Sequence, residues 1–321
     1  MTGRILITGA SGFIGRACVS EALSRGLEVV AVVRGTAPEF GPELGPGVTV
    51  LRSNLALPGS VNLLKPALKG CTGVIHAAAH LGGNESAIQA DTLTATANLL
   101  AALPQGMRLA LVSSITVYDT GRAQPGESIT EDWPLFPPGQ APDAYANAKL
   151  AQEAQARLRG APLWILRPGA VWGPGRTWHA LNGVDAGPLH LTLTSGGELP
   201  IAHVTRTAHA LVSAALTDPG GVQAINVIDD DRPTRDRFVT AHRAATGWPR
   251  LALPLPWGVW AALARALAPM AHKLPGLLRE PVLKARIMPL RWPNTALREA
   301  LGGADTERFE TLLHVSQKGP Q

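Results

Sequence analysis

The segment Thr8-Gly9-Ala10-Ser11-Gly12-Phe13-Ile14-Gly15 constrains this chain more than any other. It lies between an apolar, strand-like run (Arg4–Thr8) and a helix-like run (Phe13–Arg25). A chain that leaves a buried strand, reverses tightly and starts a helix presents backbone N–H groups and a positive helix end to an anion. The segment therefore predicts a pyrophosphate-binding turn, with the spacing G-x-x-G-x-x-G in place of the commoner G-x-G-x-x-G. The alternative is an ordinary glycine-rich turn.

Short apolar runs alternate with helix-like runs through the first half of the chain. The expected strands and helices are Arg4–Thr8, Phe13–Arg25, Glu28–Val33, Val48–Ser53, Gly73–Ala77, Glu85–Leu103, Met107–Ser113 and Asp143–Arg159. Such alternation predicts an α/β fold, a doubly wound parallel sheet with helices on both faces. The irregular segment Tyr118–Pro142 is long enough to suggest a functional loop.

The regular alternation ends after Arg167-Pro168-Gly169. At 321 residues, with no linker-like segment near the middle, the chain is expected to form one unit with two lobes. The expected division is a dinucleotide-binding domain, 1–170, and a smaller, mostly helical substrate lobe, 171–321. Within the second lobe, residues of about 203–228 are expected to return to the first sheet.

Candidate cofactor residues stand where the expected strands end, the edge at which open α/β sheets bind ligands. Arg34 follows the second strand, where a basic side chain would pair with a 2′-phosphate and an acidic one would accept from a ribose hydroxyl. This favours NADP, with NAD as the alternative and a plain exposed arginine as the non-functional interpretation. The other candidates are Asn54 and Leu55 after the third strand and Ala77, Ala78 and Ala79 after the fourth.

Three residues predict an acid/base device. Ser114 ends the fifth strand, and Tyr145 and Lys149 lie four apart on one expected helix, hence on the same face. A nearby ammonium would lower the pKa of the tyrosine from about 10, and the serine would hold the substrate oxygen against the tyrosine hydroxyl. A solvent-facing Tyr and Lys is the alternative. It is weakened because Tyr118 and Tyr145 are the only tyrosines.

These residues resemble the extended short-chain dehydrogenase/reductase family, which includes NAD-dependent epimerases/dehydratases and proteins like 3β-hydroxysteroid dehydrogenase. The resemblance rests on five ordered motifs: the 8–15 turn, Val74-Ile75-His76-Ala77-Ala78-Ala79, Ser113-Ser114-Ile115-Thr116-Val117-Tyr118, Tyr145-Ala146-Asn147-Ala148-Lys149, and Leu166-Arg167-Pro168-Gly169-Ala170-Val171-Trp172-Gly173-Pro174-Gly175.

The resemblance implies a Rossmann-type fold with Ser114, Tyr145 and Lys149 as the catalytic residues. It further implies that Lys149 holds the nicotinamide ribose, that backbone near Pro168 meets the carboxamide, and that the turn binds the cofactor through Thr8, Gly9, Ser11, Gly12, Phe13, Ile14 and Gly15. Some positions depart from the family pattern. Asn54 stands where Asp is common, Thr92 where Asn is common and Ala95 where Gly is common.

Composition argues against several other classes. The net charge of +5 comes without a Lys/Arg run or a basic stripe, so no nucleic-acid partner is expected. Cys18 and Cys71 are the only cysteines, and neither the cysteines nor the histidines show metal-ligand spacing, so no metal is expected. The N-terminus shows no secretory pattern, which together with the few cysteines predicts a cytoplasmic protein. Asp229-Asp230-Asp231 suggests a solvated turn.

The apolar run Trp257–Met270 is shorter than a bilayer span, so no transmembrane helix is expected. With Arg265 as its single charge, it predicts a helix that must be covered, by the second lobe, by substrate or by a membrane surface. The predicted function is NAD(P)-dependent reduction of a ketone, or oxidation of a secondary alcohol, on an apolar small-molecule substrate. The alternatives are a nucleotide-sugar epimerase/dehydratase and a non-catalytic dinucleotide-binding protein. A homodimer is compatible with the sequence.

Overall fold

The computed structural model describes residues 3–35, 47–82, 84–160, 162–194, 196–273 and 278–317. Its centre is a seven-stranded parallel sheet in the order β11-β6-β5-β4-β1-β2-β3. The strands are β1 (Arg4–Thr8), β2 (Glu28–Val33), β3 (Val48–Arg52), β4 (Cys71–His76), β5 (Arg108–Val112), β6 (Leu163–Pro168) and β11 (Val222–Val227). The strand order reverses between β1 and β4, the switch point at which such sheets bind ligands.

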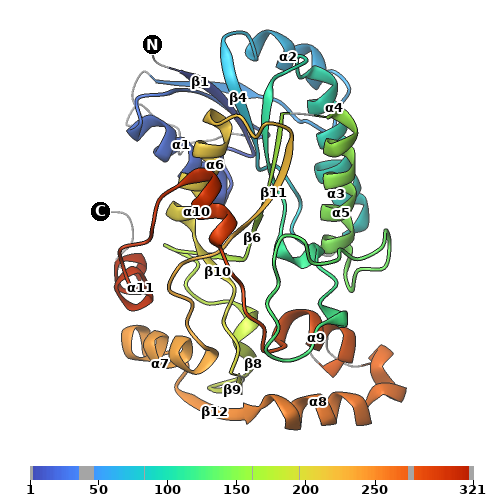
Figure 1. The fold of residues 1–321 in the computed structure, drawn as a ribbon, viewed down its shortest axis with the longest axis vertical. Helices are drawn as coiled ribbons and strands as arrows, with labels where there is room; N and C mark the ends of the chain where they lie inside the picture. Colours follow the sequence, from blue (N-terminus) through green and yellow to red (C-terminus); the bar gives the residue numbers. More distant parts are fainter. Residues whose placement is uncertain are drawn as a thin grey trace.

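Helices cover both faces of this sheet (Figure 1). On one face lie α1 (Phe13–Ser24) and α6 (Val204–Leu216), which pack against each other. On the other lie α2 (Ser60–Ala67), α4 (Ala95–Ala102) and α5 (Ala144–Arg159). Central strands are buried on both faces, and residues 29–33 of β2 are all at most 2% exposed, as expected for a near-continuous apolar run. The predicted doubly wound α/β fold is confirmed.

The helix expected over Glu85–Leu103 forms as three segments: α3 (Glu85–Ile88), the π-helix η2 (Gln89–Thr94) and α4. A π-turn inserts one extra residue into a helix and is common at functional sites. Here it carries Asp91 to the rim of a cavity that is described below. The spacing of apolar residues does not predict such an insertion, because the residues before and after it are still helical.

The second half contains strands that the sequence analysis did not predict. β7 (Ala170–Trp172) pairs with β10 (Ile201–His203), and β9 (Leu189–Thr194) pairs with β8 (Gly183–Ala186) and β12 (Leu251–Pro256). The remaining helices are α7 (Arg235–Thr246), α8 (Trp257–Ala266), α9 (Glu280–Ile287), α10 (Thr295–Leu301) and α11 (Phe309–Gln317). Short 3₁₀ turns form at η3 (Ile115–Val117), η4 (Thr120–Arg122), η5 (Ala180–Asn182) and η6 (Ala268–Lys273). β7, β8 and β10 have only three or four residues each, and β12 contains two prolines, which weakens its strand pattern.

Two expectations need correction. Asp229 is not solvated: its side chain is 2% exposed and accepts hydrogen bonds from the His203 backbone N–H and from Trp172 Nε1. Helix α8 is covered on one face only, with Trp260 buried and Val259 55% exposed. Within the described ranges, each helix is too short or too polar to traverse a lipid bilayer.

Candidate active site

Two cavities open beyond the carboxyl ends of β1 and β4. The smaller has a volume of about 220 Å³ and is lined by residues that follow β1, β2, β3 and β4, together with Asp91 and Ala95. The larger has a volume of about 440 Å³ and contains the start of α1, the end of β5 and one face of α5. The glycine turn contributes to both, so the two cavities suit the two halves of a dinucleotide.

Glycine is required in the turn itself. Gly9 has φ +64°, and a Cβ there would lie 2.7 Å from the backbone N of Ala78. A Cβ at Gly15 would lie 2.0 Å from the carbonyl oxygen of Gly9. Neither contact is sterically tolerable, so the turn is packed against the end of β4 and against itself. The packed turn lines both cavities, with Gly9 and Ser11 at the smaller and Phe13, Ile14 and Gly15 at the larger.

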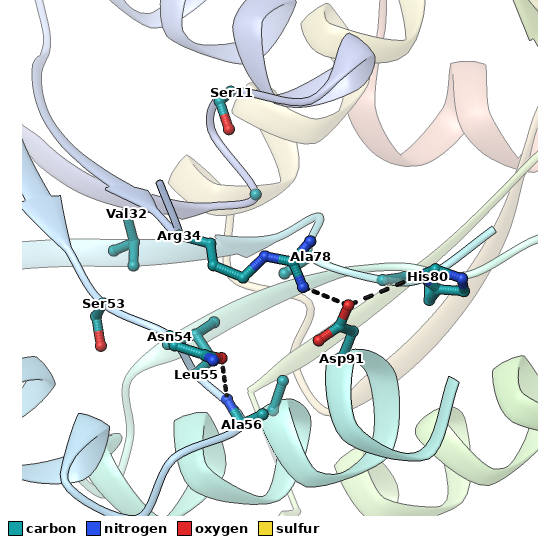
Figure 2. A pocket seen from close by; sticks show the side chains of 13 residues that line it. Ser11, Val32, Arg34, Ser53, Asn54, Leu55, Ala56, Ala78, His80 and Asp91 are labelled. Carbon is teal, nitrogen blue, oxygen red and sulfur yellow. Dashed lines mark hydrogen bonds and ion pairs between the residues drawn. The ribbon is translucent and has the colours of Figure 1, made fainter. Parts of the chain in front are cut away.

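In the smaller cavity, Arg34 reaches across to helix η2 and pairs with Asp91 (Figure 2). His80 Nδ1 lies 3.7 Å from the same carboxylate. Asn54 Oδ1 accepts from the backbone N–H of Ala56 at 3.0 Å. Ser53 Oγ is buried and has no hydrogen-bond partner among the described residues, so the cavity offers a hydroxyl to a ligand.

The structure gathers most of the predicted residues around these cavities. Gly9, Ser11, Arg34, Asn54, Leu55, Ala78 and Ala79 line the smaller one, and Phe13, Ile14, Gly15, Ala77, Ala79, Ser114, Tyr145, Lys149 and Pro168 line the larger. Thr8 and Gly12 line neither. Thr8 is fully buried, with its hydroxyl bonded to His76 Nδ1 at 2.6 Å. The backbone N–H of Gly12 donates to the Gly9 carbonyl at 2.9 Å, which closes the turn.

Ser114, Tyr145 and Lys149 meet in the larger cavity. Asp143 caps α5 by accepting from the Ala146 N–H at 2.9 Å, and so sets where the helix begins. One turn separates Tyr145 from Lys149, whose Nζ lies 5.9 Å from the centre of the tyrosine ring. Ser114 Oγ hydrogen-bonds to Tyr145 and also accepts from Thr116 Oγ1 at 3.0 Å. The serine therefore connects the end of β5 to the helix.

The titration behaviour of this cavity differs from the expected effect of the lysine. Burial raises the pKa of Tyr145, although its hydrogen bond with Ser114 acts in the opposite direction. Burial also lowers the pKa of Lys149 to about 7, while the Glu153 carboxylate opposes that shift. Desolvation disfavours the charged form of both groups. Both shifts therefore favour the uncharged forms, the phenol of Tyr145 and the amine of Lys149.

Lys149 is held by a chain of buried hydrogen bonds. Its ammonium donates to the Val112 carbonyl at 2.8 Å and to Gln152 Oε1 at 2.9 Å. Gln152 Nε2 donates to Thr96 Oγ1 at 2.9 Å, and Thr96 lies 2.9 Å from His76 Nε2. Since His76 also bonds Thr8, the chain runs from the lysine to the first residue of the glycine turn. The sequence analysis did not predict a role for Gln152, because this residue meets Thr96 only in the folded chain.

A buried ion pair lies behind the lysine. Glu153 accepts from Arg167 Nε at 2.9 Å and Nη2 at 2.7 Å, and both side chains are 2% exposed. Arg167 Nη1 donates to the Tyr118 hydroxyl at 3.0 Å, and that hydroxyl donates to Asn226 at 2.7 Å. Ser113, next to Ser114, donates to Glu153. The network therefore joins β5, β6, β11 and α5 directly beneath the cavity.

The far wall of the larger cavity comes from the second half of the chain. Met288, Leu290 and Trp292 supply an apolar surface, and Arg176, Arg235 and Arg286 add positive charge. No acidic side chain is among the described residues that line this cavity. Arg176 lies over the Phe13 ring at 4.9 Å, at the start of α1. None of residues 257–266 lines it, so α8 does not form the substrate wall.

A family model, that of the NAD dependent epimerase/dehydratase family, matches residues 5–186. The chain belongs to this family. That range includes the glycine turn and all three residues of the predicted acid/base device.

Several known proteins and structures resemble the chain. A 2-alkyl-3-oxoalkanoate reductase of Shewanella oneidensis is 26% identical over 298 residues, which is 86% of this chain and 74% of the relative. A polyketide synthase-nonribosomal peptide synthetase of Pyricularia grisea is 30% identical over 187 residues, but these are 53% of this chain and only 4% of the relative. The structure of MoeE5 in complex with UDP-glucose and NAD matches with a TM-score of 0.68 at 23% identity, covering 98% of this chain and 97% of MoeE5.

The sequence analysis noted Thr92 and Ala95 as departures from the pattern of the family that the chain resembles, and the structure shows their surroundings. Thr92 Oγ1 accepts from the His80 backbone N–H at 3.0 Å, and Ala95 lines the smaller cavity. The sequence analysis also missed Val32, Ser53, Ala56, His80 and Asp91 in the smaller cavity and Arg286, Met288, Leu290 and Trp292 in the larger. Four of these residues, Val32, Ser53, Ala56 and His80, lie within two positions of a predicted residue. The others carried no sequence signal, because their distance along the chain hides their proximity.

Proposed function

We propose that this protein is an NAD(P)-dependent oxidoreductase that reduces a ketone or oxidises a secondary alcohol. The observation that carries the proposal is that Ser114, Tyr145 and Lys149 share one cavity with the start of α1 and with Pro168. A substrate carbonyl in that cavity can reach the phenol while it faces the place where a nicotinamide would lie.

The residues present fit a dinucleotide. The glycine turn supplies backbone N–H groups for a pyrophosphate, and Ser53 Oγ and Asn54 offer polar contacts in the smaller cavity. Arg34 supplies the positive charge that a 2′-phosphate requires, so we propose NADP as the preferred cofactor and NAD as the alternative. When bound, the nicotinamide donates or accepts the hydride.

The three residues of the larger cavity would divide the remaining chemistry. Ser114 Oγ would hydrogen-bond to the substrate oxygen and hold it at the Tyr145 hydroxyl. Tyr145 would give its proton to that oxygen during reduction and take it back during oxidation. Two of the three protons of the Lys149 ammonium are donated to Val112 and Gln152, which leaves the third for the cofactor ribose.

The substrate that fits this cavity is largely apolar. Met288, Leu290 and Trp292 form its far wall, which favours a ketone or alcohol with a hydrocarbon body over a sugar. The Shewanella relative is named for its action on a 2-alkyl-3-oxoalkanoate, a keto acid whose body is hydrocarbon. A nucleotide-sugar epimerase or dehydratase is the second candidate, because the family is named for that chemistry and three arginines line the cavity.

The Tyr145→Phe variant tests the proposal. We expect turnover of a panel of ketones and alcohols to fall by about 10²- to 10⁴-fold, the usual contribution of a positioned acid or base. NADPH binding, measured by fluorescence titration, should stay unchanged because the phenyl ring remains. Wild-type turnover in this variant would refute the assignment.

Net redox change separates the two candidate reactions. A reductase consumes NADPH continuously, which lowers the absorbance of the reduced nicotinamide in step with product. An epimerase returns the hydride to its substrate and gives product with no net change in that absorbance. The substrate panel should therefore include nucleotide sugars beside the apolar ketones.

We also propose that the protein acts in the reducing environment of the cytoplasm. Cys18 and Cys71 are both unpaired and buried, and burial raises the pKa of each thiol. A protein that keeps its only cysteines reduced fits a compartment in which thiols persist.

A further inference from the structure

An exposed apolar face remains at the end of the molecule farthest from the N-terminus, where α8 runs along the surface (Figure 1). Its members are Leu251 and Leu253 of β12, Val259 and Leu263 of α8, and Met270 of η6, which are 58%, 53%, 55%, 41% and 53% exposed. We call these five residues the 251–270 face. Helix α8 contacts both β12 and η6, so the five lie on adjoining elements.

The opposite side of α8 holds the helix in place. Trp260 and Ala264, which are one turn apart, are 6% and 0% exposed and pack with Leu193, Leu283 and Ile287. Rotating the helix to bury Val259 and Leu263 would expose this tryptophan, at a cost of several kcal/mol on the scale of about 25 cal/mol per Å² of apolar surface. The exposed side is therefore a stable feature of the fold.

Basic side chains outnumber acidic ones in the segment that forms this face. Between Asp236 and Glu280 the sequence contains no Asp or Glu, whereas it carries Arg237, Arg243, Arg250, Arg265, Lys273 and Arg279. Arg250 borders β12, and Arg265, with a side chain 72% exposed, lies on α8 beside the apolar residues. The acidic side chain that approaches Arg265 is Glu280, at 3.8 Å. An apolar surface with a basic rim matches an anionic bilayer, whose headgroups are negative and whose interior is hydrocarbon.

A second copy of this chain fits the face less well. A two-fold interface places the same patch against itself, so Arg250 and Arg265 of one copy would approach the same residues of the other. That juxtaposition is repulsive, and the nearby Glu280 carboxylate is already shared between Arg265 and Lys284 of its own copy. A bilayer instead supplies the opposite charge to both arginines. Trp257, half-buried at the first residue of α8, suits the boundary between headgroup and hydrocarbon.

We propose that the 251–270 face docks on an anionic lipid bilayer and so places this protein on a membrane surface. The face is separate from the reaction, since α8 lines neither cavity. It lies close to the larger cavity, because α9 packs against α8 and contributes Ala285 and Arg286 to the lining. Docking would thus bring the catalytic cavity within one helix of the bilayer.

Vesicle sedimentation with the full chain tests this proposal. Phosphatidylcholine vesicles are compared with vesicles in which about a third of the lipid is phosphatidylserine. We expect the protein to pellet with the anionic vesicles and to stay in solution with the zwitterionic ones. Binding should weaken as salt is raised from 0.01 M to 0.15 M, because the Debye length falls from about 30 Å to about 8 Å. No binding to anionic vesicles at low salt would overturn the proposal.

Paired variants locate the contact. The Val259→Asp/Leu263→Asp protein should bind anionic vesicles about tenfold more weakly, because it places carboxylates in the apolar surface. The Leu158→Asp/Val315→Asp protein is the matched control, since these residues are 89% and 59% exposed elsewhere, and it should lose much less. An independent Arg250→Glu/Arg265→Glu protein should also lose about tenfold or more, at about 1 kcal/mol for each arginine near the surface.

Urea unfolding midpoints close to that of the wild type show that a variant is folded. If Val259→Asp/Leu263→Asp does not fold, Arg250→Glu/Arg265→Glu provides the test instead. Equal losses in the control and in the 251–270 variants would overturn the proposal. So would a dimer, seen by sedimentation velocity, that Val259→Asp/Leu263→Asp dissociates, because the face would then join two copies of the chain.

Discussion

Lys149 shows how a single buried residue depends on its neighbours. The residue is 3% exposed, and its ammonium is kept in position by a backbone carbonyl and by the amide of Gln152. Burial lowers the pKa of Lys149 to about 7. Its charge is therefore fully present only below that pH and is lost as the pH rises through it. Each acceptor at the ammonium stabilises the charged form and thereby extends the pH range in which the lysine can work.

Substitution of Gln152 should move this limit in a predictable direction. Gln152→Leu removes an acceptor from the ammonium, so the basic limb of the kcat/KM profile should shift to lower pH. Gln152→Glu places a carboxylate there instead, so the same limb should shift to higher pH. The profile of kcat/KM reports the free enzyme, in which these contacts exist. A purely structural role would reduce activity in both variants without opposite shifts.

Arg34 makes the second residue-scale prediction, which concerns cofactor choice. The Arg34→Asp change should weaken NADPH binding more than NADH binding, by about tenfold to a hundredfold, because charge-assisted bonds contribute about 1.5–3 kcal/mol. Asp91 competes with the 2′-phosphate for this guanidinium, so Asp91→Asn should tighten NADPH and leave NADH nearly unchanged. Fluorescence titration of both cofactors gives the ratio. An unchanged ratio in Arg34→Asp removes Arg34 from cofactor selection.

Among the elements, α5 carries Tyr145, Lys149 and Glu153 within sixteen residues, and its cap Asp143 directly precedes it. Asn147 ties the preceding loop to the helix, because its side chain bonds both the N–H and the carbonyl of Ala141. One turn beyond Lys149, Glu153 connects the helix to Arg167 of β6. The helix is therefore anchored at its start and its middle, on either side of Tyr145 and Lys149.

Two arginines that share Glu153 offer a matched stability test. Arg167 is 2% exposed in its side chain, whereas Arg157 is 43% exposed and lies 3.7 Å from the same carboxylate. Arg167→Leu should lower the free energy of unfolding by about 3–5 kcal/mol, because it leaves a buried carboxylate without its partner. Arg157→Leu should cost less than about 1 kcal/mol. Urea denaturation of the two variants gives both values, and similar losses would contradict this account of the pair.

At the scale of the whole molecule, the chain leaves the large sheet and comes back to it. β11 pairs with β6 at the sheet edge, and α6 packs on α1. We therefore propose that residues 1–170 and 171–321 form two lobes that share one hydrophobic core. Residues of about 203–228 belong to the second lobe in sequence but pack with the large sheet. Leu211, Val212, Ala214 and Ala215 of α6 are all buried in the same cluster as β1 and β2.

Truncation tests this shared core. A fragment ending at residue 186, where the family model ends, lacks α6 and β11 and exposes one face of the sheet. We expect it to aggregate, or to bind the dye ANS without a cooperative urea transition. The full chain under the same conditions is the control. A cooperative transition in the fragment would show that the first lobe folds alone.

Local pattern was enough to predict the sheet, the conformation of the glycine turn and the meeting of Ser114, Tyr145 and Lys149 in one cavity. The turn can be predicted from sequence because it requires glycine. Gly9 has a positive φ, and a Cβ at Gly9 or Gly15 would collide with backbone atoms. The sheet is readable because strands buried on both faces are almost wholly apolar. Tyr145 and Lys149 are readable because a helix places residues four apart on one face.

The tertiary structure decided the features that depend on distant pairs. Asp91 meets Arg34 across 57 positions, and Gln152 meets Thr96 across 56, so no periodicity or motif relates them. The same holds for the apolar wall from Met288 to Trp292, and for the choice of which side of α8 is buried. These residues come together only when the chain folds. A sequence pattern predicts only the local structure of residues that are close along the chain.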